Sequence, residues 1–331
     1  MLEKIREYLK EQQLVEKLQL KEPFTIEFLA QGEYNQNFLI SAGQKKYVFR
    51  LNYGSQLNLE NQIRYEYQAL KWLERTNRTP RVLYVDDSCQ KFSQGLLIME
   101  FLAGKPLNYR NDLNEAAVIF GEIHQQPIDE AADTLFVKEK ATILSARVNE
   151  CQQLLEPVLH SDFVPISAQR LLAVALNQCA KNIKQQQFFV ELDQWRVNNT
   201  EVNSHNFIIG KKGFLIDWEK PVISHPVQDI SQFLASTTTL WRSNLVLTQT
   251  KKQAFFSSYL QTTGFDSKSF SEALRIYHPY LMLRALSWSA MAYDSYKRDT
   301  KELKNQEIFE KVSSYMNEDF LRQTLKEEVF E

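Results

Sequence analysis

The sequence predicts an α+β fold with two unlike parts, on three observations. Between about residues 24 and 101, short runs rich in β-branched and aromatic residues alternate with turn residues, which is typical of a small antiparallel sheet. Beyond Gly104 the pattern changes to long segments with helical periodicity. A short hairpin pattern near residues 206–217 interrupts them. We therefore expect a sheet-containing part at 1–101, a larger, mostly helical part at 102–331, and a ligand cleft between them.

Length and composition are those of a soluble, cytoplasmic protein. The chain has 331 residues, of which 44% are hydrophobic and 24% are charged, enough for a substantial core. A net charge of −2 without a long basic block argues against nucleic-acid binding through a basic face. Cys89, Cys151 and Cys179 are an odd and widely spaced set. This pattern argues against a disulfide framework or a thiolate metal site and fits a reducing cytosol.

The N-terminus predicts an amphipathic helix rather than a signal peptide or a membrane anchor. Leu2, Ile5 and Leu9 recur at helical spacing among charged residues, so we expect this helix to pack on the body of the protein. A helix lying on a membrane surface is the alternative, but the apolar face is narrow. No run approaches the roughly 18 apolar residues of a membrane span, so no membrane partner is expected.

In the first part, five runs predict strands and one predicts a helix. Ile63, Leu70 and Leu73 share one face of the helix, and Glu66 lies on the same face. A charge there is costly unless it is paired, and Arg50, which ends an apolar run, is the candidate partner. An acid at the edge of a buried stripe is the alternative. The strands are expected at 24–29, 37–41, 46–51, 81–86 and 96–101, and the helix at 59–75.

The second part is expected to be built mainly from helices. Pro279 falls inside the last long helical segment, so we expect that segment to be kinked or split there. The helical segments are expected at 113–124, through 130–187, and at 229–240, 253–262 and 269–296.

The hairpin carries the residues that point most clearly to chemistry. Asn206 begins one apolar run and Asp217 ends the other, so a hairpin brings them to the same end. An amide oxygen beside a carboxylate suits Mg²⁺, which prefers oxygen ligands and shares its shell with phosphates. Glu201, five residues before Asn206, can reach the same site as a base. Polar residues that merely cap a surface hairpin are the alternative.

Taken together, these motifs resemble the aminoglycoside phosphotransferase and choline kinase group of small-molecule kinases, which share the protein-kinase-like fold. The resemblance spans roughly residues 25 to 300, and its most specific segment is Ile-Asp-Trp-Glu at 216–219. The motifs occur in the family's order: a turn with Gly32 and Asn35, Val48-Phe49-Arg50, Glu66, Leu-Leu-Ile-Met-Glu-Phe at 96–101 with Gly104, His124, and then Glu201 five residues before Asn206.

The resemblance implies a role for each matching position. Gly32 and Asn35 would belong to the loop over the nucleotide phosphates, although that segment taken alone favours a simple turn. Arg50, paired with Glu66, would contact phosphates. The backbone of Glu100 to Leu102 would form the hinge that meets the adenine, with Met99 at the back of the pocket. Asn206 and Asp217 would hold Mg²⁺. Asp229 would brace the catalytic loop, and His124 is expected to be structural.

The main departure from the family lies in the catalytic loop. Where the family usually has His-Gly-Asp, this chain has Asn199-Thr200-Glu201, so the expected base is a glutamate, one methylene longer. The expected function is transfer of the γ-phosphate of ATP, with Mg²⁺, to a hydroxyl of a small molecule. The alternatives are a pseudokinase that binds nucleotide without transfer, and a kinase acting on a protein side chain. Little chain separates Asp217 from Asp229 to hold a peptide.

The helical part is expected to line the acceptor pocket, although aromatic residues at helical spacing are also typical of core. Glu219 and Lys220 follow the metal aspartate and are expected to face the acceptor, or Lys220 to pair with Glu201. The candidate lining residues are Trp241, Arg242, Tyr277, Tyr280, Arg284 and Trp288.

Overall fold

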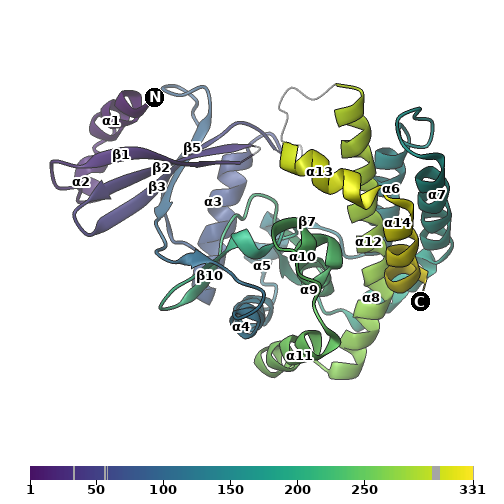
Figure 1. Cartoon of the computed structure of the whole chain (residues 1–331). Helices are drawn as coiled ribbons and strands as arrows, with labels where there is room; N and C mark the ends of the chain where they lie inside the picture. The colour runs from purple at the N-terminus through teal and green to yellow at the C-terminus, as the bar shows by residue number, and fades with distance from the viewer. Residues whose placement is uncertain (33, 56, 58, 300–305, 331) are drawn as a thin grey trace.

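The computed structural model describes residues 1–32, 34–55, 57, 59–299 and 306–330. The N-terminal sheet lies at one end of the molecule and the long helix α12 (Ser267–Lys297) at the other, with the strand β10 (Gly213–Leu215) between them (Figure 1). Within the described ranges, no helix combines the length and apolar character that crossing a membrane requires.

The predicted sheet is confirmed, with each strand within two residues of its expected position. It is antiparallel throughout, with strand order β1-β2-β3-β5-β4. Its strands are β1 (Thr25–Gln31), β2 (Asn35–Ala42), β3 (Lys45–Asn52), β4 (Val82–Asp86) and β5 (Gly95–Glu100).

Different helices cover the two faces of this sheet. Side chains alternate along β3, so its successive residues pack against one set of helices or the other. Phe49 and Leu51 are buried with the N-terminal helices α1 (Leu2–Glu11) and α2 (Leu14–Lys17). Val48 packs on the opposite face in the larger core, which includes α3 (Gln62–Leu73). Arg50 shares the parity of Val48, so the strand directs it toward α3. The expected N-terminal helix packs on the body as predicted.

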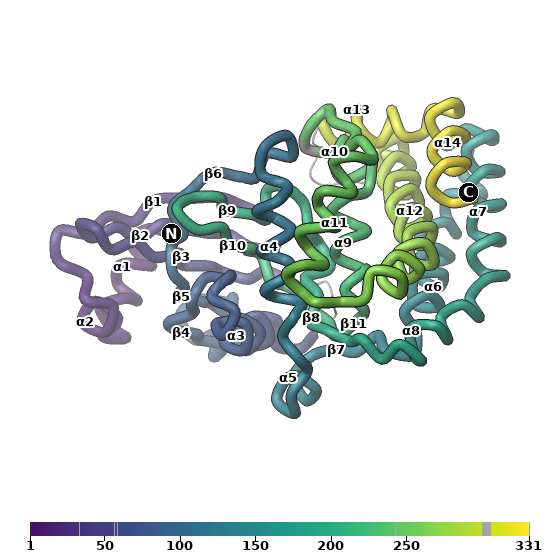
Figure 2. Tube along the Cα trace, turned by 90° about the horizontal axis from the view of Figure 1, so that it is seen from below, coloured from purple at the N-terminus to yellow at the C-terminus, as the bar shows by residue number. Residues whose placement is uncertain are grey.

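The rest of the chain is mostly helical, as predicted. Helices α4 and α11 lie side by side, and α12 packs along α6 and α9 (Figure 2). Besides α12, the described α-helices of this larger part are α4 (Leu113–His124), α5 (Glu130–Leu135), α6 (Ile143–Leu155), α7 (Ile166–Lys181), α8 (Gln187–Leu192), α9 (Val227–Leu234), α10 (Ser236–Arg242), α11 (Gln249–Thr263), α13 (Gln306–Tyr315) and α14 (Glu318–Leu325).

Three helical expectations need correction. The predicted split at Pro279 is wrong, because α12 continues through the proline. Side chains on both sides of it, such as Tyr277 and Leu281, are buried, so their packing outweighs the one backbone hydrogen bond that proline removes. The stretch 130–187 is broken into several helices, and β7 (Val137–Lys138) follows the first of them. The helix expected at 229–240 is two helices, because Ala235 has extended backbone angles.

The predicted hairpin is confirmed and sits where the two parts of the chain meet. Strands β9 (Phe207–Ile209) and β10 pair antiparallel, and the short β6 (Lys105–Pro106) pairs with β9. The linker before β6 passes the hairpin closely, since a Cβ at Gly104 would lie 2.6 Å from the carbonyl oxygen of Ile209. A second small sheet joins β7, β11 (Val222–Ser224) and β8 (Arg196–Asn198), the strand that leads into the catalytic loop.

The packing of α1 makes a stability prediction. Leu9 is fully buried, whereas Leu2 on the same helix is 41% exposed. Leu9→Ala is expected to lower the free energy of unfolding by about 2–5 kcal/mol, because it leaves a cavity against the sheet. Leu2→Ala, the matched control, is expected to change it by less than about 0.5 kcal/mol. Urea unfolding measures both, and equal effects would mean that α1 does not pack as described.

Candidate active site

Arg50 is the centre of the candidate site. Its guanidinium forms an ion pair with Glu66 on α3 and lies 3.3 Å from Asp217, just after β10. Its Nε donates to the Asn37 side chain at 2.9 Å. Arg50 is 7% exposed and Glu66 1%, so the predicted pairing of these two residues is real and buried. One cation thereby connects the sheet, α3 and the hairpin.

A cavity of about 310 Å³ opens beside this cluster, between the sheet and the hairpin. Apart from the charged cluster, its walls are largely apolar. The backbone N–H of Leu102 makes no hydrogen bond to any residue that the structure describes, so it is available to a ligand. The cavity is lined by Leu29, Ala30, Asn37, Val48, Arg50, Glu66, Leu70, Pro80, Met99, Glu100, Phe101, Leu102, Gly104, Ile208, Ile216 and Asp217.

Glu219 adds a further acid to the cluster. Asn35 donates its side-chain amide to Glu219, which therefore faces the sheet. Glu219 does not line the cavity beside Glu201 that is described below. Burial, reinforced by the neighbouring carboxylates of Asp217 and Glu66, raises the pKa of Glu219 to about 9. Burial likewise raises the pKa of Glu66, although Arg50 opposes that shift. The cluster therefore holds more carboxylates than one arginine neutralises.

Asp229 binds the backbone of the loop at 199–201, the expected catalytic loop. Its two carboxylate oxygens accept the backbone N–H groups of Asn199 at 2.7 Å and Thr200 at 2.8 Å. His124 lies 3.4 Å from the same carboxylate and is fully buried, which agrees with the structural role expected for it. Two such hydrogen bonds are the contacts expected of a residue that braces the loop.

Thr200 occupies a strained conformation at the position where the resembled family has glycine. Its φ is 72°, in the left-handed region that β-branched residues rarely adopt. Such a residue costs about 1–3 kcal/mol and persists only where its surroundings hold it. Here the Thr200 hydroxyl donates to the Lys220 carbonyl at 3.0 Å, in addition to the Asp229 contact. The loop thus reaches this shape without glycine.

Glu201 is paired with Lys220 across the loop. Lys220 Nζ lies 2.8 Å from Glu201 Oε1, so the ion pair considered in the sequence is present. Burial lowers the pKa of Lys220, and the Glu201 carboxylate opposes that shift. The Glu201 side chain remains 36% exposed.

A second cavity, of about 350 Å³, opens on the Glu201 side. Asn206 and Asp217 both line it, so the hairpin brings them to one end as predicted. The Asn206 side-chain oxygen accepts the backbone N–H of Asn203 at 3.0 Å, and its carbonyl accepts that of Ile216 at 2.7 Å. The remaining lining residues are Glu201, Val202, Asn203, Gln232, Thr237, Thr238, Trp241, Arg284, Ala285, Trp288, Ser289 and Tyr315.

The structure brings together most of the residues expected at the site. Gly32 lies in the β1–β2 turn, where its N–H donates to the Asn35 carbonyl, but it does not line either cavity. Tyr277 and Tyr280 are core residues, and the Tyr280 hydroxyl donates to the Cys179 carbonyl. The Arg242 side chain lies outside the described part of the structure. Gln232, Thr237, Thr238, Ser289 and Tyr315 carry no sequence pattern that marks them as pocket residues, and only the packing of α9, α10, α12 and α13 gathers them.

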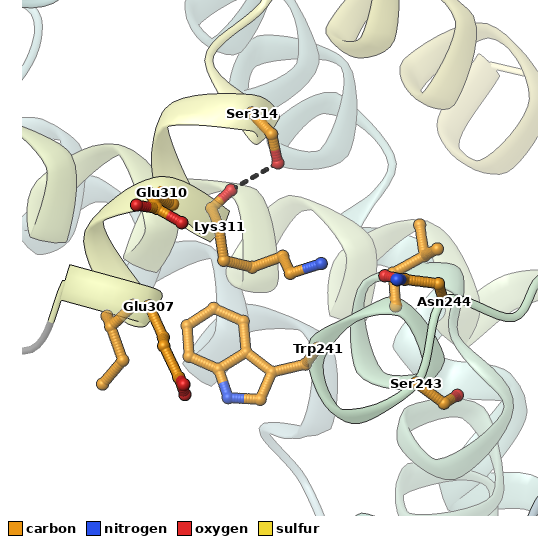
Figure 3. Close-up of a pocket in the computed structure, with 9 residues that line it drawn as sticks. Trp241, Ser243, Asn244, Glu307, Glu310, Lys311 and Ser314 are labelled. Carbon is orange, nitrogen blue, oxygen red and sulfur yellow. Dashed lines mark hydrogen bonds between the residues drawn. The ribbon is translucent and has the colours of Figure 1, made fainter.

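A separate hollow of about 590 Å³ adjoins the second cavity at Trp241. The Trp241 indole lies between the two helices that form this hollow, with Lys311 extended along it and Glu307 and Glu310 beside it (Figure 3). Among the described residues, Trp241 alone lines both.

Comparison with known proteins identifies relatives at the level of family and fold. A family model described as the phosphotransferase enzyme family matches residues 25–262. No curated protein matches the chain.

Several solved structures share the fold at low sequence identity. A putative aminoglycoside phosphotransferase from Ralstonia eutropha superposes with a TM-score of 0.71 at 13% identity, covering 98% of each chain. A choline kinase from Cryptosporidium parvum gives 0.61 at 13% identity, covering 92% of this chain and 89% of its own. A spectinomycin phosphotransferase, solved with ADP and spectinomycin, gives 0.59 at 12% identity over 95% and 96%. The expected kinase-like α+β fold is thereby confirmed.

The bracing by Asp229 makes a testable prediction. Asp229→Asn is expected to lower the free energy of unfolding by about 2–3 kcal/mol, because one oxygen that accepts a buried N–H becomes a donor. Thermal or urea unfolding measures the loss. Asp162→Asn is the matched control, since Asp162 is exposed and its variant should unfold like the wild type. If both variants unfold alike, Asp229 does not brace the loop.

Proposed function

Because this chain belongs to the phosphotransferase enzyme family, we propose that it transfers the γ-phosphate of ATP to a hydroxyl of a small molecule. Residues 1–101 would form the nucleotide-binding lobe, and residues 102–331 would carry the catalytic loop and the acceptor pocket. One observation carries the proposal: Asp217 lines both cavities, so a nucleotide in one and an acceptor in the other would meet at its carboxylate.

The first cavity suits a nucleotide. The N–H of Leu102, which makes no hydrogen bond to the described residues, lines the same cavity as the apolar Val48 and Met99 and offers a hydrogen bond to the edge of an adenine ring. Arg50 at the inner end provides a fixed positive charge for phosphates. The spectinomycin phosphotransferase that shares the fold was solved with ADP, which supports a nucleotide as the donor.

The residues present also fit Mg²⁺. The described residues include no cluster of three or more His, Cys, Asp or Glu side chains arranged to hold a metal by themselves. A magnesium ion that keeps waters and phosphate oxygens needs only one or two protein carboxylates. Asp217 and Asn206, which line the same cavity, would hold the ion. When bound, Mg²⁺ neutralises phosphate charge.

Glu201 is the proposed base. Phosphoryl transfer through a loose transition state depends mainly on positioning and charge stabilisation, so a longer acid can serve if it is held in place. Lys220 provides that hold at 2.8 Å. The same ion pair favours the alternative, a pseudokinase, because it occupies the carboxylate that would have to take the proton of the acceptor hydroxyl. Turnover decides between them.

The role of Glu201 is tested by its amide. Glu201→Gln is expected to lower kcat roughly 100- to 10,000-fold in an ATP-consumption screen over hydroxyl metabolites, because the amide cannot accept the proton. Binding of Mg·ATP, measured by calorimetry, should be unchanged. Glu156→Gln, at an exposed residue just after α6, is the control and should keep full activity. Mg·ATP binding without turnover on any acceptor in the wild type would establish the pseudokinase instead.

A further inference from the structure

We propose that the acceptor carries an anionic group, a carboxylate or a phosphate ester, and that Arg284 binds it. This inference rests on the proposed function, since it names the class of molecule that the second cavity takes. Arg284 lies on α12, one turn before Trp288, and both side chains line the cavity that Glu201 and Asp217 open into.

The charges lining that cavity favour an anion. The lining acids are Glu201 and Asp217, and each already has a cation beside it: Lys220 at 2.8 Å and Arg50 at 3.3 Å. A positively charged acceptor would therefore have to displace an existing partner. Away from the transfer centre, the described lining side chains are neutral except for Arg284.

The guanidinium of Arg284 is held so that most of its donors remain available. Its Nε donates to Glu150 Oε1 at 2.8 Å, and Nη1 and Nη2 make no hydrogen bond to the described residues. The side chain is 21% exposed and lines the cavity. Two parallel N–H groups at the end of a guanidinium match the two oxygens of a carboxylate or phosphate.

The ion pairs behind Arg284 fix its orientation. Glu150 Oε2 lies 2.9 Å from Arg147 Nη1, and Arg147 in turn pairs with Glu139. Charges thus alternate along Glu139, Arg147, Glu150 and Arg284, and only the last of these lines the cavity. The positive end of the chain of ion pairs is the end that meets the acceptor. If Arg284 only tied α12 to α6, the contact through Nε would suffice, and its other nitrogens would have no role.

The experiment compares probes that differ in one substituent. Glucose, glucuronate, glucose 6-phosphate and glucosamine, and the matching set glycerol, glycerate and glycerol 3-phosphate, are titrated calorimetrically into protein saturated with a non-hydrolysable ATP analogue and Mg²⁺. An anionic member is expected to bind about tenfold or more tightly than its neutral parent, because the guanidinium adds two charge-assisted hydrogen bonds. Whether the carboxylate or the phosphate gains more identifies the anion.

Arg284→Gln is expected to remove that preference while leaving the neutral probes unaffected. Arg275→Gln is the matched control, because Arg275 lies on the same helix but is exposed and bonded to Glu272. Arg284→Lys keeps the charge without the paired donors, so several-fold weaker anion binding is expected from a variant that keeps the contact with Glu150.

The outcomes separate this inference from the proposed function. A preference for neutral or cationic probes, anions that fail to bind at millimolar concentration, or an anion preference that survives Arg284→Gln would each overturn it. Mg·ATP binding, measured in the same titrations, reports on the proposed function independently. Anion binding that depends on Arg284 in a protein that does not bind Mg·ATP would contradict the proposed function and leave the anion site standing.

Discussion

The ion pairs of Arg50 are the interaction on which the rest of the structure depends. A buried cation is tolerated only when it is paired and hydrogen-bonded, and Arg50 finds its partners on three different elements: Asn37 on the sheet, Glu66 on α3 and Asp217 at the end of the hairpin. Removing one partner would leave a buried charge uncompensated, which is costly. The sheet, α3 and the hairpin are therefore locked in one arrangement, and that arrangement forms the first cavity.

The hairpin in turn couples the two cavities. Asp217 adopts a φ of 66° and its carbonyl accepts the side-chain amide of Asn199, so Asp217 and the loop at 199–201 are held to each other. Asp229 accepts two backbone N–H groups of the same loop, and Thr200 adopts a strained conformation within it. Among the described residues that line the second cavity away from Glu201 and Asp217, Arg284 is the charged side chain.

Much of this could be predicted from sequence because the informative residues violate a local pattern. Glu66 stands out as a charge on an apolar helix face, and Asp217 as an acid that ends an apolar strand, so both were found. The strands were found because their period of two is unmistakable in short apolar runs. The continuity of α12 through Pro279 was missed, because only tertiary packing decides it. Thr237 and Thr238 were missed as cavity residues for the same reason. The direction in which Glu219 points was also missed, because its partner Asn35 is distant in sequence.

The most direct test of the account is a calorimetric titration of the wild-type protein with ATP, once with Mg²⁺ and once with EDTA. If Arg50, Asp217 and Asn206 form a magnesium-nucleotide site, ATP should bind at one site with Mg²⁺, and its affinity should fall by about tenfold or more without the metal, because no cation then lies between the Asp217 carboxylate and the phosphates. Equal affinity in the two titrations, or no binding at millimolar ATP, would contradict the account.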